Sequence, residues 1–253
     1  MTPDPRDLTI RPARPEEFAR LAVIAREGDS AADASYLDFV SEHGTLLVAA
    51  RDEVVAAFGG VIEFGGSAMV TDLFVDADAR GSGIGGRLLE TLLDGRPQRM
   101  TFSSQHAAAL PAYRRAGMTP SWRLLYFAST TPSPASKPAA LPRGAAWRHD
   151  RPELIRYFAS RGATIDADVV TMHGPDSAVD IVRLHSDTPV ATFTAVLDAL
   201  PPGSSVTCCT PEHSPVAAAA RRLGFDIIDH DIFCASTDVA LPDDLHCLHP
   251  GLG

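Results

Sequence analysis

The chain has 253 residues, of which 45% are hydrophobic and 21% charged, as in an ordinary soluble globular protein with one large domain or two small ones. Its 22 basic and 32 acidic residues give a formal charge of −10, which argues against a nucleic-acid partner. No apolar run approaches the ~20 residues that span a bilayer, and no signal peptide is evident, so we expect a cytoplasmic protein without a membrane partner.

Hydrophobic periodicity predicts a mixed α/β fold for the first half of the chain. A strand at 8–13 precedes a helix at 15–27, which Pro15 opens. The next predicted elements are a short helix at 36–42, two strands within 45–64 that fold back at 51–53, a strand at 68–78, a helix at 84–93, a strand at 99–104, a helix at 108–117 and a strand at 121–129. The order is therefore β-α-α-β-β-β-α-β-α-β.

The second half of the chain contains a stretch that is similar in sequence to part of the first half. Residues from His106 to Thr130 align without a gap with residues from His213 to Thr237, at an offset of 213 − 106 = 107. Both stretches begin with His, contain an Arg-Arg pair followed by Gly, and end in Ala-Ser-Thr. This pattern indicates a tandem duplication, the alternative being two unrelated helix-strand units that look alike.

Residues 131–142, which are rich in Pro, Ser and Ala and lack periodicity, are predicted to be a linker. The predicted domains are thus 1–130 and a shorter, diverged copy over 143–237, followed by a tail over 238–253.

A glycine-rich stretch, RGSGIGG at residues 80–86, precedes the predicted helix at 84–93 and is typical of a phosphate-binding loop. Gly81, Gly83 and Gly86 fit the dinucleotide pattern G-x-G-x-x-G. A dinucleotide site would also need a tight strand-to-helix turn and an acid about 20 residues further on, and both are missing. No Gly-Lys-Ser/Thr follows, which excludes a Walker loop.

LFVDADARGSGIG resembles the GNAT superfamily of acyl-CoA-dependent N-acetyltransferases. The loop of that family reads Gln/Arg-x-x-Gly-x-Gly/Ala, and Arg80, Gly83 and Gly85 match it. The resemblance covers about residues 8 to 128, including the order of elements. It implies a mixed, mostly antiparallel GNAT sheet flanked by helices, with a second, smaller GNAT-like α/β domain.

A second stretch, HAAALPAYRRAGM, resembles the family segment that usually begins with Asn and ends Tyr-x-x-x-Gly-Phe. Tyr113 and Gly117 match, whereas Met118 replaces the Phe and His106 replaces the Asn. The resemblance implies that Tyr113 is the general acid, and a phenol with a pKa near 10 can protonate a leaving thiolate.

Acetyl-CoA is the cofactor that the resemblance implies, with coenzyme A as product. Glycines let backbone N–H groups approach a pyrophosphate, and the helix N-terminus and Arg80 add positive charge. The end of the preceding strand is expected to pair with the pantetheine arm. The predicted cofactor-binding residues are Leu73, Phe74, Val75, Arg80, Gly81, Ser82, Gly83, Ile84, Gly85, Gly86 and His106.

The resemblance implies a carboxylate base on the strand that contains Asp72, which makes Asp72 the candidate general base, directly or through water, with Glu63 as a second choice. Leu73 and Val75 are expected to face the core, and Asp72 the opposite side. The implied reaction is direct acetyl transfer to a small-molecule amine. Alternatives are a protein N-terminal or lysine acetyltransferase and a non-catalytic acyl-CoA sensor. The second copy has no glycine loop, and Ala220 stands where the first has Tyr113, so we expect no catalysis there. A second copy of the chain, forming a homodimer, is a further candidate partner.

Four cysteines are present, and none forms Cys-x-x-Cys, so we expect reduced and mostly buried thiols. His246, Cys247 and His249 offer metal-ligand atoms near the C-terminus. A frayed tail is the favoured interpretation of that segment, and no metal is predicted.

Overall fold

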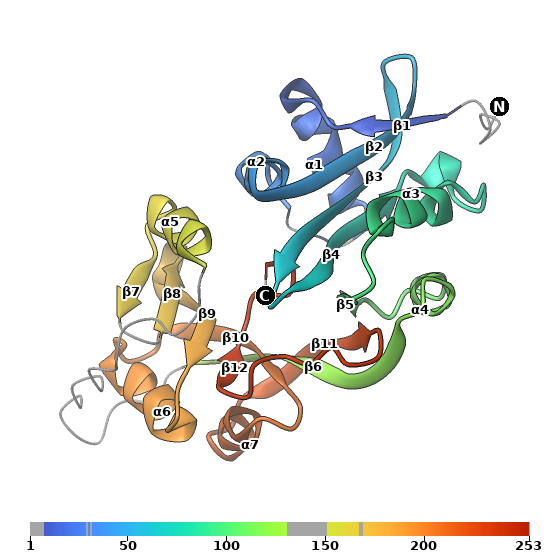
Figure 1. Cartoon of the computed structure of the whole chain (residues 1–253). Helices are drawn as coiled ribbons and strands as arrows, with labels where there is room; N and C mark the ends of the chain where they lie inside the picture. Colours follow the sequence, from blue (N-terminus) through green and yellow to red (C-terminus); the bar gives the residue numbers. More distant parts are fainter. Residues whose placement is uncertain (1–7, 29, 31, 131–150, 167–168, 253) are drawn as a thin grey trace. The chain divides into compact units, whose positions relative to one another are not determined.

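The chain folds into two units, each built around β-strands (Figure 1). The computed structural model describes residues 8–28, 30, 32–130, 151–166 and 169–252. Unit 1 comprises Met1–Pro120 and Cys234–Val239, and unit 2 comprises Ser121–Phe233 and Ala240–Gly253. The predicted linker at 131–142 lies outside the described residues.

Unit 1 is a mixed, mostly antiparallel sheet with helices, which confirms the predicted fold class. Its elements are β1 (Thr9–Pro12), α1 (Phe18–Arg26), α2 (Ala34–His43), β2 (Gly44–Arg51), β3 (Val54–Phe64), β4 (Ser67–Val75), α3 (Ile84–Leu93), β5 (Arg99–Ser103) and α4 (Ala109–Arg115). Strands β1 to β4 pair antiparallel in chain order, and β4 pairs parallel with β5.

Two adjacent glycines in β3 show that α2 and α3 cover opposite faces of this sheet. A Cβ built on Gly59 would lie 2.7 Å from Leu92 Cδ1 of α3, and one on Gly60 would lie 2.9 Å from Val40 Cγ1 of α2. Successive residues of a strand point to opposite faces, so each helix packs against one face at close range. Neither position has room for a side chain.

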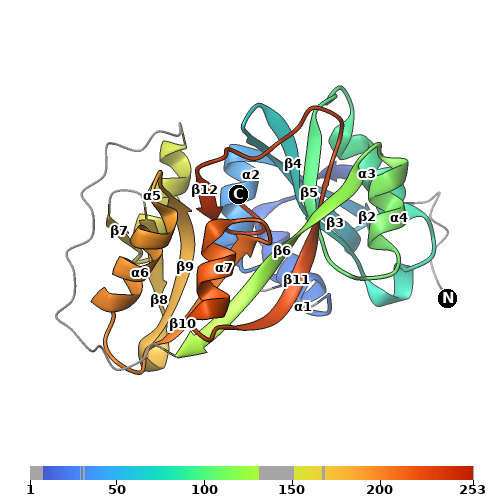
Figure 2. The same cartoon turned by 90° about the horizontal axis from the view of Figure 1, so that it is seen from below.

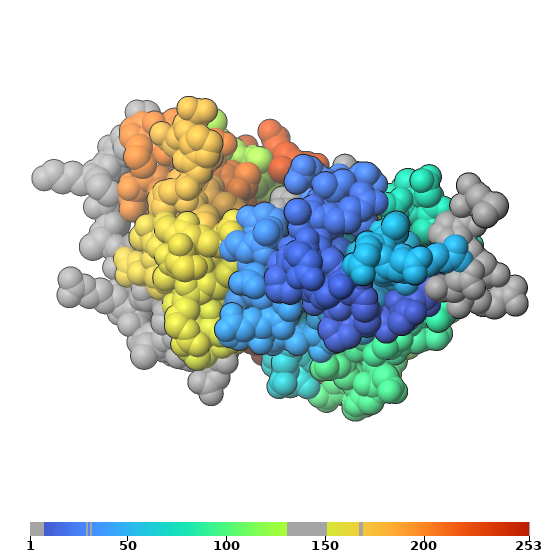
Figure 3. All heavy atoms as spheres, turned by 90° about the horizontal axis from the view of Figure 1, so that it is seen from above, coloured from blue at the N-terminus to red at the C-terminus, as the bar shows by residue number. Residues whose placement is uncertain are grey.

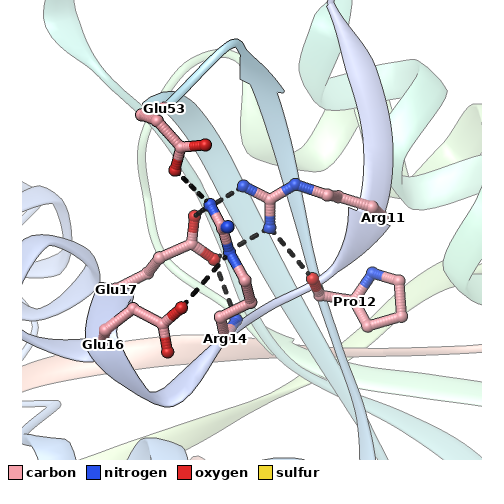
Figure 4. Close-up of polar contacts among 6 residues, drawn as sticks. All are labelled: Arg11, Pro12, Arg14, Glu16, Glu17 and Glu53. Carbon is pink, nitrogen blue, oxygen red and sulfur yellow. Dashed lines mark hydrogen bonds and ion pairs between the residues drawn. The ribbon is translucent and has the colours of Figure 1, made fainter.

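An ion-pair network joins the N-terminal segment to the turn between β2 and β3 (Figure 4). Glu17, which is buried, accepts from Arg11 Nη2 at 2.6 Å, and Arg14 Nη2 donates to both Glu17 Oε1, at 3.2 Å, and Glu53 Oε2. These hydrogen bonds, first of all the one from Arg11, lower the pKa of Glu17 to about 2. On the face in Figure 3, the dark-blue N-terminal segment lies beside the lighter blue turn.

Unit 1 also contains residues from near the C-terminus. The Ser236 N–H donates to Arg99 O at 2.9 Å, and the Arg99 N–H donates to Ser236 Oγ at 2.9 Å. The Arg99 guanidinium in turn donates to Leu93 O at 3.1 Å and to Ala116 O at 2.9 Å, which caps the ends of α3 and α4.

Unit 2 has its own strands and helices. Its elements are β6 (Thr119–Thr130), α5 (Pro152–Ser160), β7 (Thr164–Asp166), β8 (Val169–His173), β9 (Ala178–His185), α6 (Pro189–Ala199), β10 (Ser205–Pro211), α7 (Pro215–Arg222), β11 (Asp226–Ala235) and β12 (Leu245–Cys247). β10 pairs antiparallel with β6 and parallel with β9, and β9 pairs antiparallel with β8. Figure 2 shows α6 beside β9.

The division into units differs from the predicted ranges of 1–130 and 143–237. β6 was expected to complete the first domain, yet from Ser121 onward it belongs to unit 2, where Leu124 to Thr130 pair with β10. Phe127 of β6 lies in the core cluster of that unit, together with Phe193 of α6 and Val216 of α7.

The prediction of a frayed C-terminal tail is wrong. β12 pairs with β9, and the side chains of Leu245, Cys247 and Leu252 each expose 3% of their surface or less. Apolar burial on this scale outweighs the entropy that keeps many chain ends loose. Cys208 and Cys234 are also buried, whereas Cys209 is partly exposed.

Candidate coenzyme and acetyl-transfer site

Two parallel strands of unit 1 diverge at the predicted site. The β4–β5 pairing covers only Ala68–Val70 and Arg99–Thr101, although β4 continues to Val75. At the point of divergence, the buried Thr101 hydroxyl donates to Val70 O at 3.0 Å. Beyond this point, the backbone of β4 that would face β5 is available to another extended chain.

The segment after β4 keeps the arginine beside the strand end. A short 3-10 helix at Ala77–Ala79 comes first, with the Asp76 side chain accepting from the Asp78 N–H at 3.1 Å. Arg80 comes next, and its Nε donates to Val75 O at 3.2 Å. The guanidinium is thus anchored where β4 ends, close to the start of the glycine loop.

The glycine loop adopts a conformation that favours glycine at two positions. Gly81 has φ 76° and Gly83, the N-cap of α3, has φ 84°. The Ile84 N–H donates to Ser82 Oγ at 3.4 Å. A Cβ built on Gly85 would lie 3.1 Å from Val75 Cγ2, and one on Gly86 would meet nothing within 4 Å. The first-turn N–H groups of α3 therefore lie on an open backbone surface with a partial positive charge.

Asp72 and Leu73 face opposite sides of the sheet, as predicted. A Cβ built on Gly60 would lie 3.5 Å from Asp72 Oδ2, on the α2 side, and one built on Gly59 would lie 3.4 Å from Leu73 Cδ1, on the α3 side. The burial differs from the expectation: Asp72 is 5% exposed, whereas Leu73, Phe74 and Val75 are partly exposed. Asp72 is buried because α2 covers the face to which it points.

Asp72 meets a partner that the sequence analysis did not find. The Tyr36 hydroxyl, from α2, donates to Asp72 Oδ2 at 2.8 Å, and both side chains are buried. Burial raises the pKa of Asp72 to about 6, and the hydrogen bond from Tyr36 opposes that rise. No local pattern links the two residues, since only the packing of α2 on the sheet brings them together.

Glu63 lies away from the divergence. It is exposed and pairs in register with Ala68, where β4 and β5 are still paired. Asp72 pairs instead with Gly60, just beyond the last β4–β5 pair. The structure therefore favours Asp72 over Glu63 as the candidate base.

Tyr113 is buried on α4 at 7% exposure, and Met118 N–H donates to its backbone O at 3.0 Å. His106, which is exposed, stands before α4, and the Ala108 N–H donates to its Nδ1 at 3.2 Å. This bond holds the His106 ring against the turn that leads into α4.

Within the described ranges, no group of three or more His, Cys, Asp or Glu side chains could hold a metal ion. His246 contacts Ser214 Oγ at 3.1 Å instead, and Cys247 is buried. None of the helices in these ranges has both the length and the apolar character needed to cross a membrane.

Residues 42–119, which contain the diverging strands and the glycine loop, match the family model for the acetyltransferase (GNAT) domain. The chain carries a GNAT acetyltransferase domain. It is therefore an N-acetyltransferase that depends on acetyl-CoA. The site fits this cosubstrate, because β4 offers backbone beside the divergence and Gly85 and Gly86 place no side chain on the first turn of α3.

Solved structures share the GNAT fold. A proposed acetyltransferase from Pyrococcus horikoshii is similar over 97% of this chain and 95% of its own, with a TM-score of 0.75 and 14% identity. A GCN5-related N-acetyltransferase from Sphaerobacter thermophilus is similar over 93% and 96%, with a TM-score of 0.55 and 13% identity. At these identities the likeness establishes the fold. No curated protein matched the chain.

Proposed function

We propose that the chain transfers an acetyl group from acetyl-CoA directly to a small-molecule amine, in the cleft between β4 and β5. The divergence of these strands beside the glycine loop carries the proposal, because one cleft then offers both an edge for the pantetheine arm and N–H groups for the pyrophosphate.

The coenzyme is held along β4 and the loop. Leu73, Phe74 and Val75 present their backbone to the pantetheine arm, and Arg80 and the residues from Gly81 to Gly86 face the pyrophosphate. His106 lies before α4 as a further contact. Arg80 supplies a full charge, which makes its contact with phosphate stronger than a neutral hydrogen bond.

Asp72 is the proposed general base. An alkyl amine with a pKa near 10.4 costs about 4–5 kcal/mol to deprotonate at pH 7, so a nearby proton acceptor helps. Asp72 receives the proton, directly or through water, as the amine nitrogen attacks the thioester carbonyl. A carboxyl with a pKa of about 6 is ionised at neutral pH and is a stronger base than an ordinary aspartate.

Tyr113 is the proposed general acid. As the carbon–sulfur bond breaks, the phenol donates its proton to the thiolate, whose acid has a pKa near 8.5. The products are the acetylated amine and coenzyme A. Tyr113 comes from α4, whereas Asp72 comes from β4, so the two proton-transfer groups belong to different elements of unit 1.

Unit 2 is proposed to be a degenerate copy without catalysis. Its order β8-β9-α6-β10-α7-β11 repeats β3-β4-α3-β5-α4-β6. β6 begins at Thr119 and β11 at Asp226, a difference of 226 − 119 = 107 that equals the sequence offset. Ala220 of α7 stands where α4 has Tyr113.

A panel of amines assayed for thiol release from acetyl-CoA tests this function. We expect release with at least one small amine, and mass spectrometry should find the matching amide. Release only with peptides or proteins would assign a protein acetyltransferase. Binding of acetyl-CoA without release for any acceptor would assign a sensor.

A further inference from the structure

Unit 2 contains a second pair of diverging parallel strands. The β9–β10 pairing runs from Ala178 with Ser205 to Ile181 with Cys208, and β9 continues to His185. The pairing of β4 with β5 ends at Val70. The last paired residue is Ile181 in β9 and Val70 in β4, so the two strands correspond at an offset of 181 − 70 = 111. At this offset Leu184 corresponds to Leu73, and His185 corresponds to Phe74.

The C-terminal segment fills this second divergence. β12 pairs antiparallel with β9, with Leu245 opposite His185 and Cys247 opposite Leu184 (Figure 1). On the other side, the Leu248 N–H donates to Cys209 O of β10 at 3.1 Å. The segment thus bonds to both strands, and it pairs with the residues that correspond to the proposed pantetheine contacts.

Side-chain contacts fix the register of the segment. His246 Nε2 lies 3.1 Å from Ser186 O, so it carries the proton and donates, which leaves Nδ1 to accept from Ser214 Oγ at 3.1 Å. The Ser186 N–H donates to Asp244 O at 3.1 Å. Together with the burial of Leu245, Leu248 and Leu252, these bonds make the segment a specific occupant.

The rest of this cleft lacks the parts that a coenzyme needs. Eight residues, Asp76 to Gly83 (83 − 76 + 1), join β4 to α3, but only three, Ser186 to Thr188 (188 − 186 + 1), join β9 to α6. α6 begins with Pro189, which has no N–H to offer a phosphate. At the same offset, the position of Asp72 is taken by the buried Arg183, a cation that cannot accept a proton.

We infer that residues 244–252 are a built-in strand ligand of unit 2, bound where a pantetheine arm would lie in unit 1. The second cleft is therefore a peptide-strand site occupied by the chain's own C-terminus. The chain binds one coenzyme, in unit 1. This inference rests on the proposed function for its comparison with the first cleft, but the hydrogen bonds described for the segment join residues of unit 2.

Hydrogen exchange with mass spectrometry on the full chain, combined with calorimetric titration of acetyl-CoA, tests the inference. We expect one acetyl-CoA per chain. Without coenzyme, amides at 184–186 should already exchange slowly, because the segment pairs with them, and coenzyme should leave them unchanged. His246→Ala removes two hydrogen bonds and should speed exchange there about tenfold or more. His173→Ala, at the end of β8, is the matched control and should not.

Two acetyl-CoA molecules per chain, or slowing at 184–186 by acetyl-CoA, would overturn the inference. So would unchanged exchange at 184–186 in both His246→Ala and Leu248→Pro, the second of which deletes the N–H that bonds to Cys209. Circular dichroism establishes that each variant is folded. Failure of acetyl-CoA to slow exchange at 73–75 would count against the proposed function alone, since the exchange at 184–186 reports on the segment independently.

Discussion

The two clefts between diverging parallel strands differ in the connection that leads from the first strand of each pair to the next helix. In unit 1, an eight-residue connection (83 − 76 + 1) leaves room for two glycines with positive φ and an arginine before α3 begins. In unit 2, a three-residue connection (188 − 186 + 1) leads into a helix that begins with proline. Strand divergence alone therefore creates a groove, and the connection decides whether the groove suits a phosphate-bearing ligand or a peptide strand.

Charge within the two clefts differs as well. Asp72 of β4 is a buried carboxylate with a pKa raised by burial to about 6. Its counterpart by strand alignment, Arg183 of β9, has a pKa lowered by burial, and by the nearby Arg151, to about 9. A carboxylate can accept a proton from an amine, whereas a guanidinium that remains protonated at neutral pH cannot. We therefore expect catalysis in unit 1 alone.

The largest effect is expected from the tyrosine that only unit 1 has in this position. Tyr113→Phe should lower turnover ~10²–10⁴-fold with nearly unchanged affinity for acetyl-CoA, because it removes the proposed acid but keeps the ring. Tyr126→Phe in unit 2 is the control: its hydroxyl donates to Asp231 Oδ2 at 2.7 Å, yet its loss should leave turnover intact. Steady-state kinetics on the cognate amine decide, and full turnover in Tyr113→Phe would reduce that residue to a packing role.

A second comparison separates ligand binding from backbone strain. Gly83 at the N-cap of α3 and Gly203 between α6 and β10 have φ 84° and 79°, and neither has an atom within 4 Å of a built Cβ. Valine at either position should cost about 1–2 kcal/mol of folding stability, because a branched side chain disfavours positive φ. Only Gly83→Val should also weaken acetyl-CoA binding, by ~10²-fold or more, since its side chain would cover the N–H groups of α3. Calorimetry showing equal affinity in both variants would remove the loop from the coenzyme site.

The coenzyme loop was predictable because its signals are local. The glycines, the arginine and the strand end at Val75 lie within a few residues, and α3 covers the predicted range of 84–93. Alternation predicted the side of Asp72 relative to Leu73, but not its burial, which depends on the packing of α2 against that face. Tyr36 lies 36 residues before Asp72, and no sequence period relates a helix residue to a strand residue at that distance.

The C-terminal part was less predictable for a related reason. β12 has only three residues, Leu245–Cys247, and 59 residues (244 − 186 + 1) separate it in sequence from its partner β9. The sequence did not predict that β6 pairs with β10 of unit 2. β5 and β10 are corresponding strands, and strand propensity does not distinguish between them as partners of β6. Such non-local pairing follows from packing of the whole unit.

The buried Asp72 carboxylate should lower the stability of the fold at neutral pH, although the proposed reaction needs it. Its pKa is raised from 3.8 to about 6, so the folded state binds more protons than the unfolded state between these values, and stability falls as pH rises through them. Asp72→Asn should therefore gain up to about 3 kcal/mol at pH 7 but almost nothing below pH 4, at 1.36 kcal/mol per pKa unit. Denaturant unfolding at the two pH values measures this gain.

The same substitution should lower turnover ~10²-fold if Asp72 is the base. Tyr36→Phe provides a finer test, because the phenol stabilises the ionised carboxylate. The acid limb of the rate profile, expected near pH 6 in the parent chain, should move to higher pH in this variant. An Asp72→Asn variant that is both less stable at pH 7 and fully active would contradict both roles of the carboxylate.

The smallest effect is expected from an ion pair far from catalysis, and it contrasts a buried carboxylate in unit 1 with a more exposed one in unit 2. Glu17 is 8% exposed and pairs with Arg11 and Arg14, whereas Glu212 is 30% exposed and pairs with Arg123. Because the pKa of Glu17 is lowered from 4.5 to about 2, its contribution to stability is present above pH 4.5 and is lost as pH falls toward 2. Glu17→Gln should lower the free energy of unfolding by about 1–2 kcal/mol at pH 7, after allowance for solvent around the arginines, and Glu212→Gln by less than about 0.5 kcal/mol.

Thermal unfolding of both variants at pH 7 and pH 3 measures the difference between these two losses of stability, which should shrink at the lower pH. An equal cost for the two variants at pH 7 would mean that burial of Glu17 adds nothing to the strength of its ion pairs.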